Sequence, residues 1–517
     1  MKTNQFQKYS KKLLPFAILC GLVLLFTYGL SLTGSDLTFA SKLGEGGPNS
    51  WLSVTVKSGG NYLSALLGSM CVDIPVMRHV LVATMLCAAL IALLSYCGAE
   101  RSYSYYAVLL LGIVPASGIF AHTFSRVLGA VSVLIPALLT VLYLFTVSDL
   151  FTYKGRKKAW KIPFLFFSGF VSQLFTESVG AAIVLLSVVF LLLLTRKYGF
   201  SYHLGAHTFG CLLGFTLSLL LPGGEDRFVD SFYVMVDQFT VALDQLYVEN
   251  LLLIGLLTLA CLMLVQPIRS ERSKNCNKTL LLLLLPTGLF ILLNVIGASL
   301  KPFPVIYRYL TVLKLVAAFS YCYGILRTME HYVSKDRVIL QVRHCLIAVA
   351  VFVLVYSFCG TAQPNMLYIP HLCLVAVTVL TSLYAFHRYS RLDKVIRTPL
   401  MITAIAGVLA LSFVTAVNGY YCSAVDTHIQ ESLAGGTTEI ILPEAPYEKR
   451  ILSATDSQLS DYYDFPSHGT VTISYVPFGQ WDWKTYYEAH NVPVIEEYDE
   501  KAAETEDWAY EFEEEDK

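Results

Sequence analysis

The sequence predicts an all-α integral membrane protein with about 13 transmembrane helices and a small extracytoplasmic α+β module at its C-terminus. Of the 517 residues, 55% are hydrophobic and 15% are charged, whereas soluble globular chains carry about 25% charged residues. The charges are also sorted along the chain: 22 of the 38 acidic residues, but only five of the 37 Lys and Arg, follow residue 420. This composition excludes a cytosolic enzyme, a nucleic-acid binder and a disordered protein.

Each predicted transmembrane helix rests on an apolar run that is long enough to cross a bilayer. A hydrocarbon core of about 30 Å needs about 20 apolar residues per helix, within a range of about 17 to 25. In chain order, the predicted spans cover residues 13–33, 76–98, 105–122, 127–147, 162–176, 178–195, 205–221, 250–266, 280–298, 308–326, 344–360, 367–386 and 399–420. The fifth and sixth of these touch at Glu177, so a broken or re-entrant pair is the alternative there.

The positions of Lys and Arg predict the orientation of the spans, because cytoplasmic loops carry an excess of these residues. With the N-terminus inside, the cytoplasmic segments hold 24 Lys and Arg and the outer loops hold five. We therefore expect a cytoplasmic N-terminus and an extracytoplasmic C-terminus. The first span is long and no small-x-small cleavage site follows it, which favours an uncleaved anchor over a signal peptide.

Two outer loops carry distinctive sequences. Residues 34–75 form the first outer loop, in which the apolar spacing from Trp51 to Met70 suits a helix lying at the membrane interface. Residues 222–249 form a further outer segment, which is acidic and aromatic. The polytopic domain as a whole is predicted to cover residues 1–420.

The composition changes abruptly after residue 420. Residues 421–490 contain two β-branched, alternating runs, Thr437–Leu442 and Thr470–Val476, which predict short strands of an extracytoplasmic module. In residues 491–517, 12 of 27 residues are acidic, which is typical of a solvated and partly disordered tail.

The sequence predicts neither a metal site nor a cofactor. The 12 cysteines include no CxxC pair and mostly lie inside apolar runs, so neither a zinc site nor a disulfide framework is expected. No Gly-rich phosphate loop, Ser-His-Asp order or metal-ligand spacing occurs in the chain. A divalent metal therefore finds no support in the sequence.

Two carboxylates are the candidate catalytic residues. An ionisable side chain beside a membrane span is energetically costly, so its presence there indicates a function. Asp36 directly follows the first span, where partial dehydration raises the pKa of a carboxyl and suits it to act as a base toward a hydroxyl. Glu177 lies between two apolar stretches. The alternatives are a solvated loop position for Asp36 and a helix start at Glu177, with Thr176 or Ser178 capping the sixth span.

Five further side chains on the same outer side are candidates for substrate binding. Arginine offers a rigid fork of donors that suits phosphate oxygens. The candidates are His122, Arg126, Arg227, Tyr307 and Arg308. For each arginine taken alone, anchoring beside lipid headgroups is the alternative. His207 and His371 receive no role.

The layout resembles the GT-C superfamily of integral-membrane glycosyltransferases, and more closely an uncharacterised bacterial family of polytopic membrane proteins. The resemblance rests on an inside N-terminus, an acidic residue directly after the first span, an interfacial helix behind it and about a dozen spans. The short motifs that carry it are Ser35-Asp36, Phe175-Thr176-Glu177-Ser178, the stretch from His207 to Gly210 leading to Leu221-Pro222-Gly223, and the segment from Tyr420 to Pro443.

The resemblance implies transfer of a sugar from a polyprenyl-phosphate donor to an envelope glycan or other acceptor, on the outer face of the bacterial plasma membrane. In such enzymes, the first-loop acid deprotonates or orients the acceptor hydroxyl, and cationic side chains hold the lipid phosphate. Here the first role would fall to Asp36 and the second to Arg126, Arg227 or Arg308. Many members of the superfamily carry paired acids in the first loop, whereas this chain has Ser35 before a single Asp36.

Two other functions remain open from the sequence. A non-catalytic carrier or polymerase-like protein for lipid-linked glycans would use the outer arginines to bind its substrate and would need no base. A secondary transporter would place polar residues at the midplane of broken helices, often in repeated halves, and the sequence contains no internal repeat. The expected partners are membrane lipids for all three functions. For the glycosyltransferase and the carrier, a lipid-linked glycan is a further expected partner.

Overall fold

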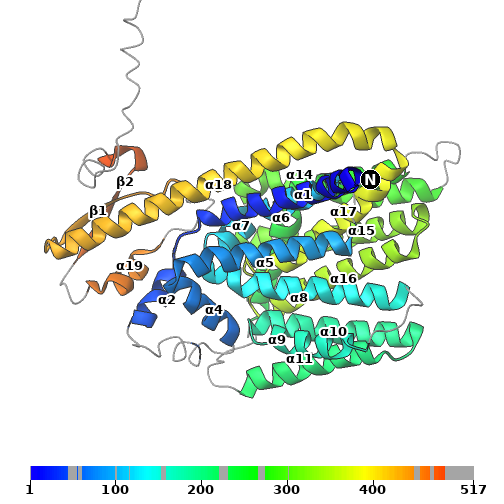
Figure 1. The fold of residues 1–517 in the computed structure, drawn as a ribbon, viewed down its shortest axis with the longest axis horizontal. Coiled ribbons are helices and arrows are strands. Elements are labelled where there is room, and N and C mark those ends of the chain that lie inside the picture. The colour runs from blue at the N-terminus through cyan, green and yellow to red at the C-terminus, as the bar shows by residue number, and fades with distance from the viewer. Residues whose placement is uncertain are drawn as a thin grey trace, which may run out of the picture.

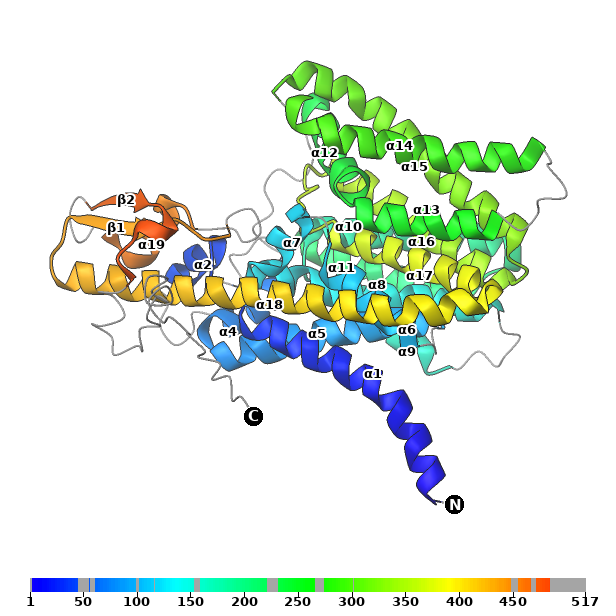
Figure 2. The same ribbon diagram turned by 90° about the horizontal axis from the view of Figure 1, so that it is seen from above.

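The computed structural model shows a long helical bundle with a smaller C-terminal part at one end (Figures 1 and 2). It describes residues 2–44, 55, 61–98, 102–115, 117–152, 159–220, 231–265, 274–300, 302–447, 454–465 and 471–483. The helices of the bundle are α1 (Lys2–Tyr28), α2 (Ser35–Gly44), α4 (Tyr62–Asp73), α5 (Pro75–Tyr96), α6 (Ser102–Ile113), α7 (Ser117–Phe124), α8 (Val127–Thr152), α9 (Lys161–Ser172), α10 (Glu177–Tyr198), α11 (Tyr202–Leu220), α12 (Phe232–Leu243), the π-helix η2 (Asp244–Val248), α13 (Leu251–Val265), α14 (Lys274–Leu300), α15 (Pro304–Tyr332), α16 (Asp336–Phe358), α17 (Tyr368–Arg388) and α18 (Ser390–Ala434).

Within the described residues, nine helices are long and apolar enough to cross a membrane, and up to eleven if each of two bent helix pairs counts as one span. This is the composition of an all-α, multi-pass membrane protein. The first and fifth predicted spans fall on shorter apolar helices, Leu14–Tyr28 and Lys161–Ser172. The full count of thirteen spans therefore stays a prediction.

Two predicted spans differ from the helices that form. The third is broken, because α6 ends before Pro115 and α7 leaves at an angle of 85°. The eighth extends into the segment predicted to be an outer loop: Phe232–Val248 is helical and meets Leu251–Val265 at an angle of 58°. The interfacial helix expected from Trp51 to Met70 is described only as α4, which begins at Tyr62.

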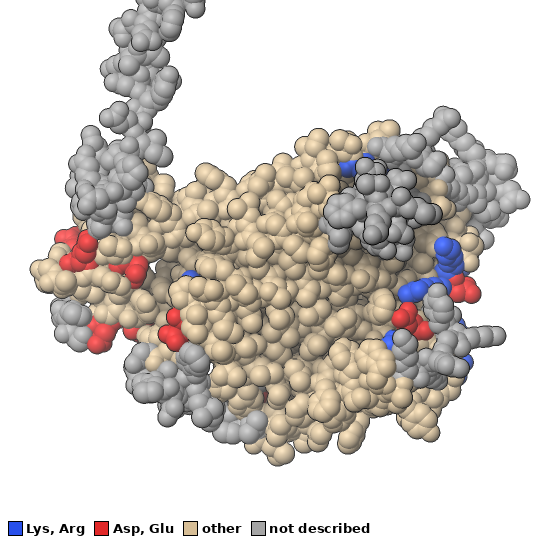
Figure 3. Space-filling model, in the orientation of Figure 1, with Lys and Arg blue, Asp and Glu red and all other residues tan. Residues whose placement is uncertain are grey.

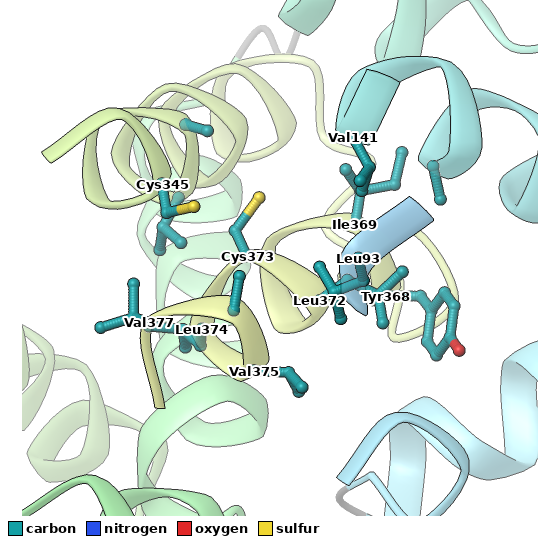
Figure 4. Close-up of a cluster of buried hydrophobic side chains, with 14 of the residues drawn as sticks. Leu93, Val141, Cys345, Tyr368, Ile369, Leu372, Cys373, Leu374, Val375 and Val377 are labelled. Atoms are coloured by element: carbon teal, nitrogen blue, oxygen red, sulfur yellow. The ribbon is translucent and has the colours of Figure 1, made fainter. Parts of the chain in front are cut away.

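Helix α17 lies at the centre of the bundle, with 78% of its apolar window buried. Its apolar side chains pack with Leu93 of α5, Val141 of α8 and Cys345 of α16 (Figure 4). Two polar groups at its start are satisfied by the broken third span: the Tyr368 hydroxyl donates to the carbonyl of Gly112 at 2.8 Å, and the His371 ring donates through Nε2 to the carbonyl of Leu111, also at 2.8 Å. The break in α6–α7 thus frees carbonyls that α17 uses.

Helices α9 and α11 approach each other closely through glycines. A Cβ added at Gly210 would lie 2.2 Å from the carbonyl oxygen of Phe166, and one at Gly214 would lie 2.6 Å from that of Phe170. Small residues at i and i+4 let membrane helices meet backbone to backbone. His207 lies one turn before Gly210. Its ring stacks on Tyr143, with centroids 3.7 Å apart, and its Nδ1 lies 2.9 Å from the Ser187 hydroxyl.

Helix α18 joins the bundle to the C-terminal part. Its 45 residues measure about 67 Å at 1.5 Å per residue, which is about twice the thickness of a bilayer core. It packs against α1, where Gly29 lies so close that an added Cβ would be 2.6 Å from the backbone nitrogen of Ala416. The second half projects beyond the bundle and carries the C-terminal elements (Figures 1 and 2).

The C-terminal elements pack on this projecting half. Strands β1 (Glu439–Pro443) and β2 (Thr472–Val476) confirm both predicted strands, and they pair in parallel with Glu439 opposite Thr472. With α19 (Asp456–Tyr463) and the short 3-10 turn η4 (Phe478–Gln480), they build a separate apolar cluster around Ile429, Ile440 and Leu459. The predicted boundary at residue 421 lies inside α18, and residues 491–517 lie outside the described residues.

Charged side chains occupy the two ends of the bundle. On the face in Figure 3, Lys and Arg gather at the end where the chain begins, Asp and Glu predominate at the end with the C-terminal elements, and the band between carries almost no charge. Such a belt is what a bilayer core requires of the surface that it contacts.

Candidate functional site

A cavity of about 1200 Å³ lies between the bundle and the C-terminal elements. Its wall is built from five segments that are far apart in the sequence. They are the end of α1 with the turn that follows (residues 28–33), Leu37 of α2, Arg78 and His79 of α5, residues 416–426 of α18, and residues 442–445, 454–463 and Tyr475 of the C-terminal part. The cavity therefore exists only because α18 carries the C-terminal elements to the C-terminal end of α1 and the N-terminal end of α5.

Arg78 brings positive charge to the cavity from the first turn of α5, and His79 beside it brings an imidazole ring. Nε of Arg78 donates to the carbonyl of Cys71 at 3.2 Å and Nη2 donates to that of Val72 at 3.5 Å, so the side chain also caps the C-terminal end of α4. Nδ1 of His79 lies 2.9 Å from the carbonyl oxygen of Thr27. Since a carbonyl oxygen only accepts hydrogen bonds, Nδ1 carries the proton in this contact, and Nε2 is not part of it.

The opposite wall carries carboxylates and phenols. Asp426 of α18 accepts hydrogen bonds from Tyr463 and Gln430, both on Oδ1, and no donor in the described part of the chain reaches Oδ2. The Tyr475 hydroxyl donates to Asp456 at 2.7 Å. Glu444 also lines the cavity. Carboxylates beside aromatic rings give a surface that accepts hydrogen bonds from hydroxyl or ammonium groups and packs against apolar ring faces.

Tyr462 lines the cavity within electrostatic range of both charged walls. Burial raises the pKa of its hydroxyl, the negative charge of Asp426 raises it further, and the positive charge of Arg78 lowers it. One phenol thus lies within electrostatic range of both a cation from the bundle and a carboxylate from α18. A ligand that passes Tyr462 would meet both charges.

Asp36, the predicted base, is fully buried behind the cavity wall. Its Oδ2 accepts from the backbone N–H of Val127 at 2.8 Å and its Oδ1 from that of Leu128 at 3.1 Å, so it caps the N-terminus of α8. Burial raises the pKa of Asp36 to about 6, against the lowering effect of these hydrogen bonds and of Arg126. The alternative of a solvated loop position is wrong, because 0% of Asp36 is exposed.

Two predicted substrate-binding residues lie close to Asp36. The charge of Arg126 acts on both Asp36 and His122. Nε of Arg126 is buried without an acceptor in the described residues. The turn that holds them is fixed by Thr33, whose hydroxyl donates to the carbonyl of Ser125 at 2.6 Å. Neither His122 nor Arg126 lines the cavity.

The other predicted residues lie elsewhere or outside the described part. Glu177 is half-buried at the first turn of α10, where its charge acts on Cys359 at the end of α16. Thr176 is the N-cap residue of α10, but its side chain makes no capping hydrogen bond. Arg227 falls within residues 221–230, outside the described residues.

Arg308 and Tyr307 belong to a polar ladder between α12–η2 and α15. Both carboxylate oxygens of Asp237 accept from Arg308, each at 2.7 Å. One turn on, the hydroxyls of Thr240 and Thr311 pair. In the last rung, Asp244 accepts from Tyr307 and lies 2.7 Å from Nζ of Lys314, which is buried. The fork of Arg308 is therefore occupied by Asp237 rather than open to a phosphate.

No group of three or more His, Cys, Asp or Glu is placed to hold a metal ion within the described ranges. His371 is a packing residue that also lies 3.0 Å from the Asn250 side chain. Sequence reasoning missed Arg78, His79 and Asp426. The available signal was that Arg78 sits three residues inside an otherwise apolar run, where a charge is costly.

Comparison with known proteins adds nothing to this geometry. No protein-family model matches the chain, and no curated protein and no solved structure matches it. The functional argument therefore rests on the residues themselves.

Proposed function

We propose that this protein is an integral-membrane glycosyltransferase that moves a sugar from a polyprenyl-phosphate donor to an envelope glycan or another acceptor on the outer face of the bacterial plasma membrane. The observation that carries this proposal is the cavity of about 1200 Å³, which has Arg78 and His79 on its bundle side and carboxylates with phenols on its other side. The volume exceeds the upper end of about 300–1,000 Å³ that is usual for small-molecule sites, so a lipid-linked sugar and part of an acceptor fit its size.

The orientation with the C-terminal part outside is supported by the separation of charge. The cytoplasmic side of a membrane protein carries the excess of Lys and Arg, and these residues gather at the end opposite the cavity (Figure 3). The cavity then lies at the outer ends of the spans, where the headgroup of a membrane lipid can enter it while the tail stays in the bilayer.

In this proposal, Asp426 is the catalytic base. Its free Oδ2 takes the proton of the acceptor hydroxyl while the hydroxyl oxygen forms a bond to the anomeric carbon of the sugar. The bond between that carbon and the lipid phosphate breaks, and polyprenyl phosphate leaves with the bonding electrons. Attack from the face opposite the phosphate inverts the anomeric centre.

Asp36 acts from behind the wall in this scheme. Its negative charge is within electrostatic range of Arg78, so it holds the cation that faces the ligand. It is a positioning residue rather than a base, because each of its oxygens already accepts a backbone N–H. The catalytic assignment that follows from the family resemblance, with Asp36 as base, stays a competing prediction.

The test is incubation of the purified protein in lipid with a panel of polyprenyl-phosphate sugars, with the donor and free polyprenyl phosphate measured over time. We expect one donor to be consumed and polyprenyl phosphate to be released. Saturable binding of a donor without consumption, in the presence of envelope glycan acceptors, would instead identify a carrier.

A further inference from the structure

The cavity is electrically polarised across its width. Among its lining residues, the basic side chains are Arg78 and His79, which are adjacent on α5. The acidic ones are Asp426, Glu444 and Asp456, all from α18 and the C-terminal part. A bound molecule with one anionic end and one end that donates hydrogen bonds would therefore take a single direction in the cavity.

The guanidinium of Arg78 is anchored but only partly used. Nε and Nη2 donate to the carbonyls of Cys71 and Val72 at the end of α4, whereas Nη1 has no acceptor among the described residues. The anchoring fixes the direction of the planar fork, and the remaining donors are left for a ligand. His79 is fixed in the same way, because Nδ1 donates to the Thr27 carbonyl and the ring lies against Tyr28, with centroids 5.8 Å apart.

Exposed apolar side chains lie next to Arg78 and His79 in the chain and at the end of α1. Val76 and Val80, on the same helix as Arg78, are 71% and 55% exposed, and Tyr28 is 75% exposed. A guanidinium and an imidazole beside exposed aliphatic residues at a helix end suit the phosphate of an amphiphile whose hydrocarbon chain lies along α5. Inorganic phosphate would make no use of this apolar surface.

We propose that Arg78 and His79 form the subsite for a single phosphate group of a membrane-embedded lipid, and that the headgroup attached to that phosphate extends past Tyr462 to Asp426. The subsite deepens the proposed function and rests on it only for the identity of the headgroup as a sugar. It is an alternative to Arg126, Arg227 and Arg308, the phosphate ligands expected from the sequence.

The charges beyond Tyr462 limit the ligand to one phosphate. A second phosphate, as in a polyprenyl diphosphate, would extend from the cations toward Tyr462, which is within electrostatic range of Asp426. Like charges brought together in a partly dehydrated site repel strongly. The cavity therefore favours a polyprenyl monophosphate over a diphosphate.

Binding is measured separately from turnover, with labelled polyprenyl phosphate added to the purified protein in nanodiscs of neutral lipid. Parallel samples contain polyprenyl diphosphate, phosphatidylglycerol or inorganic phosphate as competitor. We expect polyprenyl phosphate to bind with at least about tenfold higher affinity than any of the three. Competition by inorganic phosphate or phosphatidylglycerol at equal concentration would overturn the assignment to a polyprenyl lipid, and equal binding of the diphosphate would overturn the single-phosphate subsite.

The variants assign the subsite to residues. Arg78→Gln should weaken polyprenyl phosphate binding by about tenfold or more, because a charge-assisted hydrogen bond is lost. Arg78→Lys should weaken it by less, because the charge remains while the planar fork is lost, and His79→Gln by a few-fold, because the ring donor is lost. The matched control is Arg308→Gln, which removes an outer arginine that is paired with Asp237 outside the cavity. Unchanged binding in Arg78→Lys and His79→Gln proteins that unfold at the wild-type temperature would overturn the subsite, even if the protein consumes a donor. If the wild-type protein binds polyprenyl phosphate through these residues but consumes no polyprenyl-phosphate sugar, the result would count against the proposed function and not against the subsite.

Discussion

Asp36 illustrates how the sequence can predict the environment of a residue and yet not its contacts. A carboxylate directly after a span predicted a partly dehydrated group of raised pKa, and the pKa of Asp36 is indeed raised to about 6 by burial. Its hydrogen bonds to Val127 and Leu128 could not be predicted, because the N-terminus of α8 is about 90 residues away in the chain and no local pattern announces the contact.

The raised pKa of Asp36 predicts a pH dependence of stability. The folded state binds the proton more tightly than the unfolded chain, whose carboxyl keeps a pKa near 3.8, so the free energy of unfolding should increase as the pH falls from about 6 toward 4. The gain is on the order of 2–3 kcal/mol. Thermal unfolding in detergent between pH 7 and pH 4.5 measures it.

The Asp36→Asn variant is the control for this pH dependence. It should lose the pH-dependent gain and, at pH 7, unfold within about 1–2 kcal/mol of the wild type, because the amide nitrogen cannot accept a hydrogen bond and one of the two backbone N–H groups loses its acceptor. The Asp456→Asn variant, at an exposed position, should keep the full slope. A wild-type protein that becomes less stable between pH 6 and pH 5, with the loss absent in Asp36→Asn, would show that the capping role outweighs burial.

At the scale of elements, helices were predictable where the apolar runs are long. They were not predictable where acidic residues in a helix pair with basic residues that are distant in the chain. Residues 222–249 were predicted to be an outer loop because they are acidic. Helix α12 and η2 form there because Asp237 and Asp244 pair with Arg308 and Lys314, which lie about 70 residues later in the chain. The same pairing explains why Arg308 was wrongly expected to have an open fork.

The buried pair of Lys314 and Asp244 predicts a non-additive result. Lys314→Met should destabilise the protein by about 3–5 kcal/mol, because it leaves a buried carboxylate without its cation. The double variant Lys314→Met with Asp244→Leu should recover most of this loss, since a buried ion pair can be replaced by apolar side chains at little cost. Thermal unfolding of the two variants and the wild type gives the comparison, and a double variant no more stable than the single one would contradict it.

Close helix contact at Gly210 predicts a second effect at this scale. Gly210→Leu should destabilise the protein by about 1–3 kcal/mol or more, because its Cβ would lie 2.2 Å from the carbonyl oxygen of Phe166. The matched control is Gly288→Leu on α14, where no atom lies within 4 Å of the added Cβ. Equal unfolding temperatures for the two variants would show that α9 and α11 are not held by this contact.

At the scale of the whole molecule, the class of fold follows from composition, but the cavity does not. Hydropathy and the distribution of charge are summed over many residues, so a wrongly predicted helix boundary changes them little. For this reason the all-α membrane class was predictable. The cavity depends on α18 continuing beyond the bundle for a total of 45 residues (Figure 1), and on segments near residues 30, 78, 420 and 460 meeting in space. Without knowledge of those contacts, Asp426 carries no distinguishing pattern, and the charge of Arg78 inside an apolar run does not by itself indicate a cavity.

The predicted topology has its own test on whole cells. Cysteines introduced in place of Ser457, in the C-terminal part, and Lys157, in a predicted cytoplasmic loop, are treated with a membrane-impermeant thiol reagent. We expect labelling at position 457 and none at position 157 until the membrane is permeabilised. The opposite pattern would place the cavity on the cytoplasmic side and would remove an outer-face acceptor from consideration.

The turnover of a polyprenyl-phosphate sugar by the Asp426→Asn variant, relative to the wild type in the same liposomes, tests the catalytic assignment most directly. The variant keeps its volume and an oxygen for Tyr463 but loses the proton acceptor, so turnover should fall by about 10² to 10⁴-fold while donor affinity stays within a few-fold. Asp36→Asn should reduce turnover much less. Normal turnover by Asp426→Asn, together with a folded but inactive Asp36→Asn protein, would contradict the account and return the base to the first outer loop.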